Sequence, residues 1–492
     1  MSPLDPDACY RAVLARDARF DGVFFVGVKT TGIYCRPICP ARTPGRDRVT
    51  FHRTAAEAER AGFRACFRCR PELAPGLARV DAVPRVVGEA MRRIEAGALA
   101  GGSLAELADE LGVSSRHLRR AMHAALGISP VELAQSRRLA LARQLVADTT
   151  LPLTEVAWSS GFRSLRRFNA AFRDRYDCPP SRLRRARRPA ARAGAPTLTL
   201  TLAYRPPYDW PALLRFLGAR AVPGVEVVRG DTYLRTARLG AHRGWLAIAP
   251  APGRAALRAE ISLSLSGALM PLRARLRRLF DLDAQPATIA AHLARDPVLA
   301  ERVDARPGLR VPGAFDGFEA AVRAVLGQQV SVAAATTLAG RLAARFGESI
   351  ATPHGELTHL APTAARIAAA AQDQGDAEIA AIGIPRSRAR TLIGVARAVA
   401  AGELSLDGGG EMDSVLDRLV ALPGIGPWTA HYLAMRAFGW PDAFPETDLG
   451  VRRALGGVSG PRARALAEPW RPWRAYGVTH LWTSLGNNEG AP

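Results

Sequence analysis

The sequence predicts a multidomain α+β protein in which two all-helical regions alternate with two smaller regions of different character. Cysteines cluster within residues 1–80, and apolar residues recur with helical spacing through 81–188 and again through 311–492. Residues 197–310 alternate polar and apolar side chains in places, as strands of a small α+β sheet domain do. Residues 189–196, rich in alanine, arginine and proline, are typical of a basic linker.

Composition and charge indicate the class of partner. The chain has 492 residues, 48% hydrophobic and 23% charged, which is typical of a globular protein. Its formal net charge of +22 favours a polyanion such as nucleic acid. We find no signal peptide and no apolar run long enough to span a membrane, so we expect a cytoplasmic protein with no membrane association.

Four cysteines form two close pairs. Three residues separate Cys35 from Cys39, two separate Cys66 from Cys69, and 26 lie between the pairs. Four thiolates suit tetrahedral coordination, so the spacing predicts one Zn²⁺ bound by four cysteines. Spacing alone favours a purely structural site, yet four thiolates around a dication carry a charge of about −2 and remain nucleophilic. Arginines that could bring a DNA phosphate to them stand nearby in the sequence: Arg36, Arg42, Arg64, Arg68 and Arg70.

The stretch "GVKTTGIYCRPICPAR", followed by "AGFRACFRCRPE", resembles the N-terminal zinc domain of the Ada adaptive-response proteins over roughly residues 5–75. In that family the first cysteine of the set takes a methyl group irreversibly from a methylphosphotriester in DNA. The resemblance therefore implies that Cys35 is both ligand and methyl acceptor. Loss of one negative charge on methylation would then raise the affinity for DNA and turn damage into promoter binding.

Two segments carry the pattern of a helix-turn-helix unit. Ala108 lies four residues before Gly112, Ala157 lies four before Gly161, and the two glycines are 49 residues apart. Ser103 is the expected N-cap of the first unit. The alternative for the helix that follows each turn is a solvated basic face. The residues that we expect to contact DNA are Ser115, Arg116, Arg119, Arg120, Arg163, Ser164, Arg166, Arg167 and Asn169.

The spacing of these units, with "YDCPPSRLRR" after them, resembles the tandem module of the AraC family. The resemblance implies an all-α DNA-binding domain over residues 81–188, with two recognition helices on one face of the duplex. It also implies transcriptional activation through RNA polymerase.

The C-terminal half contains "LPGIGPWTAHYLAMRAFG", which is typical of a hairpin between two helices. Gly424 and Gly426 allow the backbone to approach a phosphate, and their N–H groups are expected to point at it near a helix start. Glycine-rich helix joints without this function also occur.

Together with "DAFPETDLGVRRAL", this hairpin resembles the HhH-GPD DNA glycosylases, and "FEAAVRAVLGQQVSVAAATTLAGRLAARFGE" narrows the resemblance to the AlkA type. The resemblance covers residues 311–492, and more weakly 197–310. It implies a DNA-3-methyladenine glycosylase of type II, with Asp448 stabilising the oxocarbenium-like sugar or orienting water. Glu446 is the local rival, and helix capping is the structural alternative for Asp448.

The same resemblance implies a pocket for a flipped base. Trp428, Tyr432 and Trp482 would form aromatic walls suited to cationic alkylated purines, although each could simply pack in the core. Gln328 and Gln329 match the loop that fills the gap left by the base, and the AlkA type has leucine at the position of Gln329.

The lysine content bears on a second reaction. Glycosylases of this superfamily that also cleave the backbone use a lysine amine as nucleophile. Lys29 is the only lysine in this chain, so we expect hydrolysis without lyase activity.

The leading hypothesis is a monomeric fusion that senses methylation damage, activates transcription and excises alkylated bases from double-stranded DNA. The alternative is an AraC-type transcription factor with a purely structural zinc site and a C-terminal half that grips DNA without catalysis.

Overall fold

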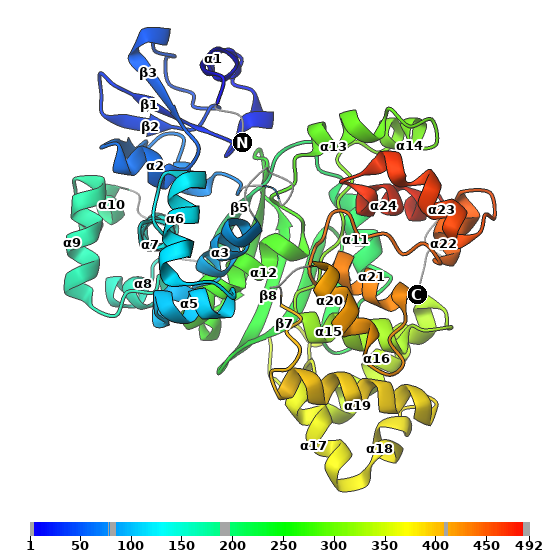
Figure 1. Cartoon of the computed structure of the whole chain (residues 1–492). Coiled ribbons are helices and arrows are strands. Elements are labelled where there is room, and N and C mark those ends of the chain that lie inside the picture. The colour runs from blue at the N-terminus through cyan, green and yellow to red at the C-terminus, as the bar shows by residue number, and fades with distance from the viewer. Residues whose placement is uncertain (1–3, 77, 79–84, 187–196, 408–411, 486–492) are drawn as a thin grey trace. The chain divides into compact units, whose positions relative to one another are not determined.

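The computed structural model describes residues 4–76, 78, 85–186, 197–407 and 412–485, so the predicted linker at 189–196 lies outside the described residues. The chain divides into two compact units (Figure 1). The first comprises Met1–Pro206, Ala251–Ala274 and Leu282–Ala284. The second comprises Pro207–Pro250, Arg275–Asp281 and Gln285–Pro492.

The first unit begins with a four-stranded sheet in the order β3-β1-β2-β4, formed by β1 (Phe25–Val28), β2 (Ile33–Cys35), β3 (Val49–His52) and β4 (Arg64–Ala65). Helices α1 (Pro6–Leu14) and α2 (Ala55–Arg60) accompany it. Strands β2 and β4 are parallel, with Tyr34 opposite Ala65. Because parallel strands end at the same edge, this register brings Cys35 beside Cys66, which is the next residue after β4.

The tandem helix-turn-helix prediction is confirmed. Its helices are α3 (Arg85–Glu95), α4 (Ala98–Gly101), α5 (Leu104–Glu110), α6 (Ser115–Leu126), α7 (Pro130–Asp148), α8 (Leu153–Ser159), α9 (Leu165–Tyr176) and α10 (Pro180–Ala186). Ser103 caps α5 in a reciprocal capping box with Glu106, as expected. Gly112 and Gly161 have φ of 67° and 80°, which only glycine adopts without cost, while Ala108 and Ala157 are buried where the helices cross.

The remaining strands of the first unit are β5 (Thr197–Ala203) and β9 (Ala256–Ser262), which pair antiparallel from Thr197 opposite Ser262 to Ala203 opposite Ala256. The alternation of polar and apolar residues in the sequence continues past this second strand, through Ser266. The strand ends instead at Ser262, where the chain enters a 3₁₀ helix (Leu263–Ala268) ahead of α12 (Leu269–Leu279). Serine hydroxyls hydrogen-bond locally here, since Ser262 Oγ and Ser264 Oγ lie 3.0 Å apart, and such bonds compete with a sheet ladder.

In the second unit, β6 (Glu226–Arg229), β7 (Thr232–Leu239) and β8 (His242–Pro250) form an antiparallel meander beside helix α11 (Trp210–Gly218). The helices that follow are α13 (Pro286–Leu293), α14 (Ala300–Ala305), α15 (Gly317–Leu326), α16 (Val332–Phe346), α17 (Ala364–Gln374), α18 (Asp376–Ala380), α19 (Arg386–Ala400), α20 (Met412–Val420), α21 (Pro427–Arg436), α22 (Leu449–Ala454), α23 (Gly460–Leu466) and α24 (Arg474–Ser484).

The predicted all-α character of residues 311–492 has one exception among the described residues. Strands β10 (Glu348–Ser349) and β11 (His359–Leu360) pair antiparallel. Two residues are too few to produce a detectable period, so the sequence pattern did not reveal them. Within the described part of the chain, no helix combines the length and apolar character needed to cross a membrane.

Candidate metal centre, nucleic-acid interface and active site

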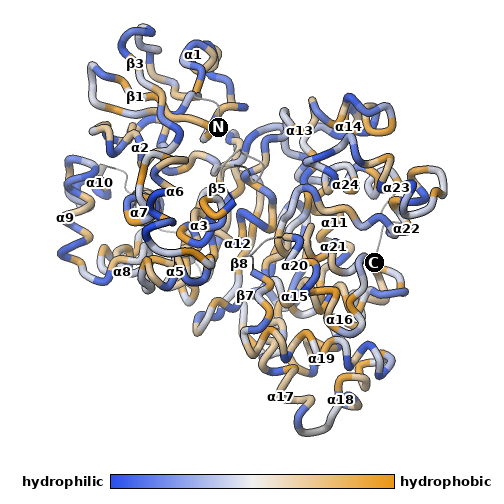
Figure 2. Tube along the Cα trace, in the orientation of Figure 1, coloured by the Kyte–Doolittle hydropathy of each residue, from blue (hydrophilic) through white to orange (hydrophobic). Residues whose placement is uncertain are grey.

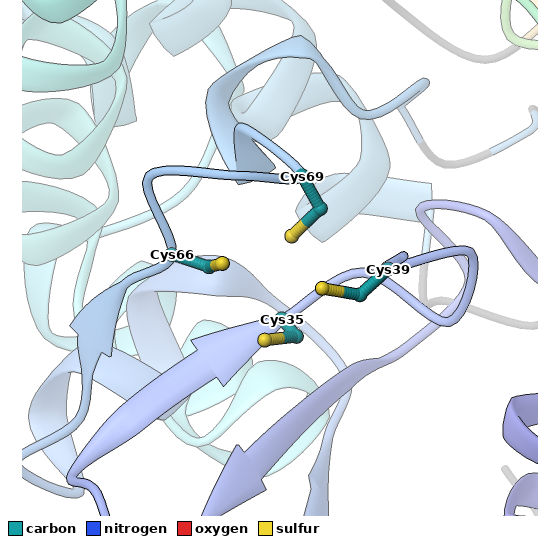
Figure 3. Close-up of side chains that lie close together, drawn as sticks. All are labelled: Cys35, Cys39, Cys66 and Cys69. Carbon is teal, nitrogen blue, oxygen red and sulfur yellow. The ribbon is translucent and has the colours of Figure 1, made fainter. Parts of the chain in front are cut away.

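The four clustered cysteines converge on one point (Figure 3), and their sulfur atoms all lie within 4.8 Å of one another. Cys35 ends β2, Cys39 lies on the following loop, and Cys66 and Cys69 follow β4. Tetrahedral zinc with Zn–S bonds of about 2.3 Å needs sulfurs about 3.8 Å apart. The donor set and the spacing therefore fit a single Zn²⁺.

The pKa values of the clustered thiols shift in opposite directions. Hydrogen bonds within the cluster, from Cys35 above all, hold the pKa of the Cys66 thiol below its ordinary range. Hydrogen bonding to Cys39 above all raises the pKa of Cys35. A bound dication would favour deprotonation of all four sulfurs. Backbone N–H groups of Arg36 and Arg68 donate to Cys69 Sγ (3.3 Å) and Cys66 Sγ (3.4 Å).

The arginines near the cysteines divide into two groups, which corrects the expectation that all five bring in a phosphate. Arg36 Nε donates to Asp21 (2.8 Å), Arg64 pairs with Asp177 (2.7 Å), and Arg70 Nε donates to Glu72 (2.8 Å). These three side chains are held by carboxylates within the protein. The side chains of Arg42 and Arg68 are exposed.

Helices α6 and α9 carry the side chains predicted to contact DNA. Arg116, Arg119 and Arg120 are exposed along α6, and Arg166 and Arg167 are exposed along α9, whereas Asn169 is only partly exposed. Figure 2 shows hydrophilic stretches along α6.

Of three further residues of this predicted interface, Ser164 and Arg163 have local structural partners. Ser115 is half-buried in the first turn of α6, where Ser114 is the N-cap. Ser164 caps α9 by accepting from the Arg167 N–H. Arg163 is exposed but donates to the Gly101 carbonyl (2.7 Å), so part of its role lies within the fold.

In the second unit, Asp448 lies at the centre of the residues predicted for the active site. Its carboxylate is 1% exposed and accepts three hydrogen bonds: Trp428 Nε1 donates to Oδ2 (2.9 Å), Trp482 Nε1 to Oδ1 (2.9 Å), and the Val451 N–H to Oδ1 (2.8 Å). The last of these bonds caps α22. Asp448 therefore caps this helix and also contacts the two predicted pocket tryptophans. Glu446, the rival carboxylate, pairs instead with Arg464.

The three predicted pocket aromatics form a continuous wall. Trp428 and Tyr432 stack with ring centroids 5.3 Å apart, and Trp482 lies 6.5 Å from Tyr432. The Tyr432 hydroxyl accepts from Arg436 Nη1 (2.8 Å). Burial raises the pKa of this hydroxyl, but the nearby positive charges of Arg436, Arg220 and Arg323 lower it further, so the net pKa lies below its ordinary value.

The predicted base-displacing loop contacts the hairpin. Gln328 Nε2 donates to the Gly424 carbonyl (3.0 Å), and Arg388 Nη2 donates to the Gln328 carbonyl (2.6 Å). Gln329 is exposed at φ 56°, a left-handed conformation that holds its side chain out of the adjoining helices. Gly424 has φ 86° and packs against Thr391, whereas Gly426 begins α21.

Several residues of these sites escaped the sequence analysis. From α19, Thr391 packs against Gly424 of the hairpin and Arg388 donates to Gln328 of the adjoining loop, while Arg220, Arg323 and Arg436 surround Tyr432. All except Thr391 are arginines in an arginine-rich chain, so their identity carried little signal. The spacing of Arg436, four residues after Tyr432 on one helix, was the one usable indication.

Comparison with known families accounts for most of the chain. The metal binding domain of Ada matches residues 8–72, and a helix-turn-helix domain matches 107–186. The AlkA N-terminal domain matches residues 199–316, and the HhH-GPD superfamily of base excision DNA repair proteins matches 322–469.

Individual proteins give the same result. The chain is 43% identical over 98% of its length, and 97% of the relative's, to a probable bifunctional transcriptional activator/DNA repair enzyme AlkA from Mycobacterium tuberculosis. It is 37% identical over 58% of its length to 97% of DNA-3-methyladenine glycosylase 2 from Escherichia coli. A 3-methyladenine DNA glycosylase structure from Archaeoglobus fulgidus shares the fold (TM-score 0.50, 22% identity), covering 58% of this chain and 97% of that one. The chain therefore belongs to the family of bifunctional transcriptional activator and DNA repair proteins that join Ada-type and AlkA-type domains.

Proposed function

We propose that this protein detects methylated DNA phosphates through Cys35, activates transcription as a monomer that recruits RNA polymerase, and excises alkylated purines such as 3-methyladenine through Asp448. The observation that carries the enzymatic part is the buried Asp448 carboxylate between two pocket tryptophans. The observation that carries the sensing part is a partly exposed Cys35 within a four-sulfur cluster.

Methyl transfer at Cys35 is a direct displacement. The thiolate sulfur attacks the methyl carbon of a methylphosphotriester, a C–S bond forms, and the C–O bond breaks with its electron pair on oxygen. The products are S-methylcysteine and an ordinary phosphodiester anion. Bound zinc supplies a charge that keeps the four sulfurs deprotonated. Cys35 and Cys39 are partly exposed while Cys66 and Cys69 are buried, so the first pair is the one that DNA can approach.

The same step changes the charge that faces DNA. Four thiolates with a zinc ion carry about −2, and methylation leaves about −1. Repulsion of a phosphate a few ångströms away falls by several kcal/mol at an effective dielectric of about 20. Methylation thereby strengthens DNA binding by α6 and α9, whose exposed arginines supply the contacts.

Base excision relies on charge placed beside the sugar. The ionised Asp448 carboxylate stabilises the oxocarbenium-like sugar as the N-glycosidic bond breaks, or orients the water that completes hydrolysis. Three N–H donors hold the carboxylate in place. Alkylated purines leave readily, so no strong general acid is required. The stacked rings of Trp428 and Tyr432 offer the flipped base an aromatic face.

Hydrolysis ends the reaction. A lyase step would need a lysine amine to form a Schiff base with the sugar, and no lysine follows Lys29. The product is therefore an abasic site with an intact backbone.

A single-turnover excision assay on DNA that contains 3-methyladenine tests the enzymatic proposal. We expect Asp448→Asn to release base at least a hundredfold more slowly than the native protein. Glu446→Gln, a matched carboxylate-to-amide change at the residue paired with Arg464, should release base at the native rate. Equal rates for Asp448→Asn and the native protein would reject Asp448 as the catalytic residue.

A further inference from the structure

Helix α7 joins the two helix-turn-helix units. It also contacts the segment that carries the second cysteine pair. We call residues 66–72 the knuckle. Arg143, in the second half of α7, donates from Nη2 to the carbonyl oxygen of Cys66 (2.8 Å). Its guanidinium lies over the ring of Phe67 (4.7 Å) and over that of Tyr176 (5.2 Å). Its side chain is 3% exposed, which is rare for an arginine.

The contact continues as a series of four charges of alternating sign between α7 and the knuckle. Arg143 Nη1 lies 2.9 Å from Glu72 Oε2, and Glu72 Oε1 accepts from Arg70 Nε (2.8 Å). Arg70 in turn makes a bidentate pair with Asp148, the last residue of α7, at 2.7 and 2.9 Å. Positive and negative charges thus alternate along the series, with the two α7 residues at its ends and the two knuckle residues between them, and all four side chains are largely buried.

The backbone of the knuckle depends on these bonds. Arg70, directly after the ligand Cys69, has φ 52°, a left-handed conformation that costs a non-glycine residue free energy and persists only where its surroundings enforce it. The Cys66 carbonyl belongs to a ligand, so Arg143 fixes the peptide that directs one sulfur toward the metal. Partners of this kind, one step removed from the ligands, commonly change metal affinity by 10- to 100-fold.

We propose that Arg143 is a positioning residue for the zinc centre, and that the knuckle and α7 form one cooperative unit. Retention of zinc then depends on the helix-turn-helix module, and by reciprocity the stability of α7 depends on zinc. The DNA-reading helices are held in their working arrangement only while the metal is bound. The proposal concerns metal retention and holds whether or not Cys35 accepts a methyl group.

Competition for zinc with a chelating dye tests the first half of the proposal on the full-length protein. We expect Arg143→Met to bind zinc at least tenfold more weakly than the native protein. Arg143→Lys should bind zinc with intermediate affinity. The lysine ammonium keeps the positive charge but lacks the planar guanidinium that contacts both Glu72 and the Cys66 carbonyl. Asp148→Asn should also weaken zinc binding through Arg70.

Arg137→Met is the matched control, since Arg137 lies on the same helix and pairs with Glu95 (2.7 Å) within the helical module. It should bind zinc as the native protein does. Arg143→Met with native zinc affinity and a native circular dichroism spectrum would overturn the proposal.

Hydrogen exchange on the native protein tests the second half and needs no variant. Zinc removal should speed exchange of the amides of residues 139–148 at least tenfold, together with those of the knuckle. Helix α19, in the other unit, should be unchanged. Faster exchange confined to the knuckle, with α7 fully protected, would overturn the cooperative link even if Arg143→Met failed to fold.

Discussion

The indole nitrogen of Trp482 lies 2.9 Å from Oδ1 of Asp448 and donates a hydrogen bond to it, although 34 residues separate the two in sequence. A residue of the predicted pocket wall therefore also orients the carboxylate that we propose to be catalytic. Trp482→Phe keeps the ring but removes this donor, and we expect single-turnover base release to slow by about tenfold or more.

The matched control is Trp440→Phe, because Trp440 stacks on His431. It should release base at the native rate. Equal slowing in both variants would show that loss of any indole in this domain, and not loss of the bond to Asp448, limits the reaction.

Gly424→Ala should destabilise the hairpin. A Cβ at this position would lie 1.9 Å from Thr391 Oγ1, and φ of 86° is costly for alanine. We expect the free energy of unfolding to fall by about 1–3 kcal/mol, with weaker DNA binding. Urea denaturation and a DNA titration measure the two effects.

Two further variants separate the causes. In the double variant Gly424→Ala/Thr391→Ala, the part of the lost unfolding free energy that comes from the steric clash should be recovered. The part that comes from the positive φ should remain lost. Gly426→Ala, whose Cβ would meet nothing within 4 Å, should unfold like the native protein. A native unfolding free energy for Gly424→Ala would contradict the close packing described here.

His480 should make stability depend on pH. Burial lowers the pKa of this imidazole from 6.5 to about 4 in the folded protein. As pH falls below 6.5, the unfolded chain binds a proton that the folded protein does not, so stability is lost between about pH 6.5 and pH 4. The whole loss amounts to about 3 kcal/mol.

Unfolding free energies of the native protein and of His480→Gln, compared across this range, isolate the contribution. As pH falls from 6.5 to 4, the unfolding free energy of the native protein should drop by about 3 kcal/mol relative to that of His480→Gln. Below about pH 4 the difference should stay constant. A difference that stays constant from pH 7 to pH 4 would mean that His480 is protonated equally in both states.

Arg42 and Arg68 should guide DNA to the cysteine cluster, because both are exposed and, within the described part of the chain, neither is paired with a carboxylate as the exposed Arg64 is. Alanine at either position should slow methylation of Cys35 at low salt, and the effect should shrink as salt screens the charge. Arg64→Ala should slow it less, since Asp177 already holds that guanidinium at 2.7 Å. Equal slowing by all three at every salt concentration would argue against steering.

Local rules made much of the fold predictable. The alanine-to-glycine spacing predicted both turns because close crossing needs a small side chain and the turn needs positive φ, as Ala108 and Gly112 show. The cysteine spacing predicted the metal cluster because the two cysteines of a short pair can bind the same ion, and both pairs can share it. The expectation that Ser103 begins a helix rested on side-chain capping and was confirmed.

Contacts between distant segments were beyond such rules. Arg143 meets the Cys66 carbonyl across 77 residues, and no period or motif marks that arginine among its neighbours on α7. Arg36 and Arg70 were expected to face DNA. Both are buried instead, and each is paired with a carboxylate that no sequence pattern links to it. The resemblance already favoured Asp448 over Glu446, but no sequence pattern predicted that two tryptophans would donate to the Asp448 carboxylate, because only tertiary packing brings them together.

The central claim is that one chain performs two separate reactions, and one experiment tests it directly. Native protein, Cys35→Ser and Asp448→Asn are each incubated with DNA that carries methylphosphotriesters and 3-methyladenine. Released base and S-methylcysteine are then measured by mass spectrometry in the same sample. We predict that Cys35→Ser releases base without gaining a methyl group, and that Asp448→Asn gains one methyl group on Cys35 without releasing base. Native base release by Asp448→Asn, or a methyl group found only on Cys9 or Cys178, would contradict the account.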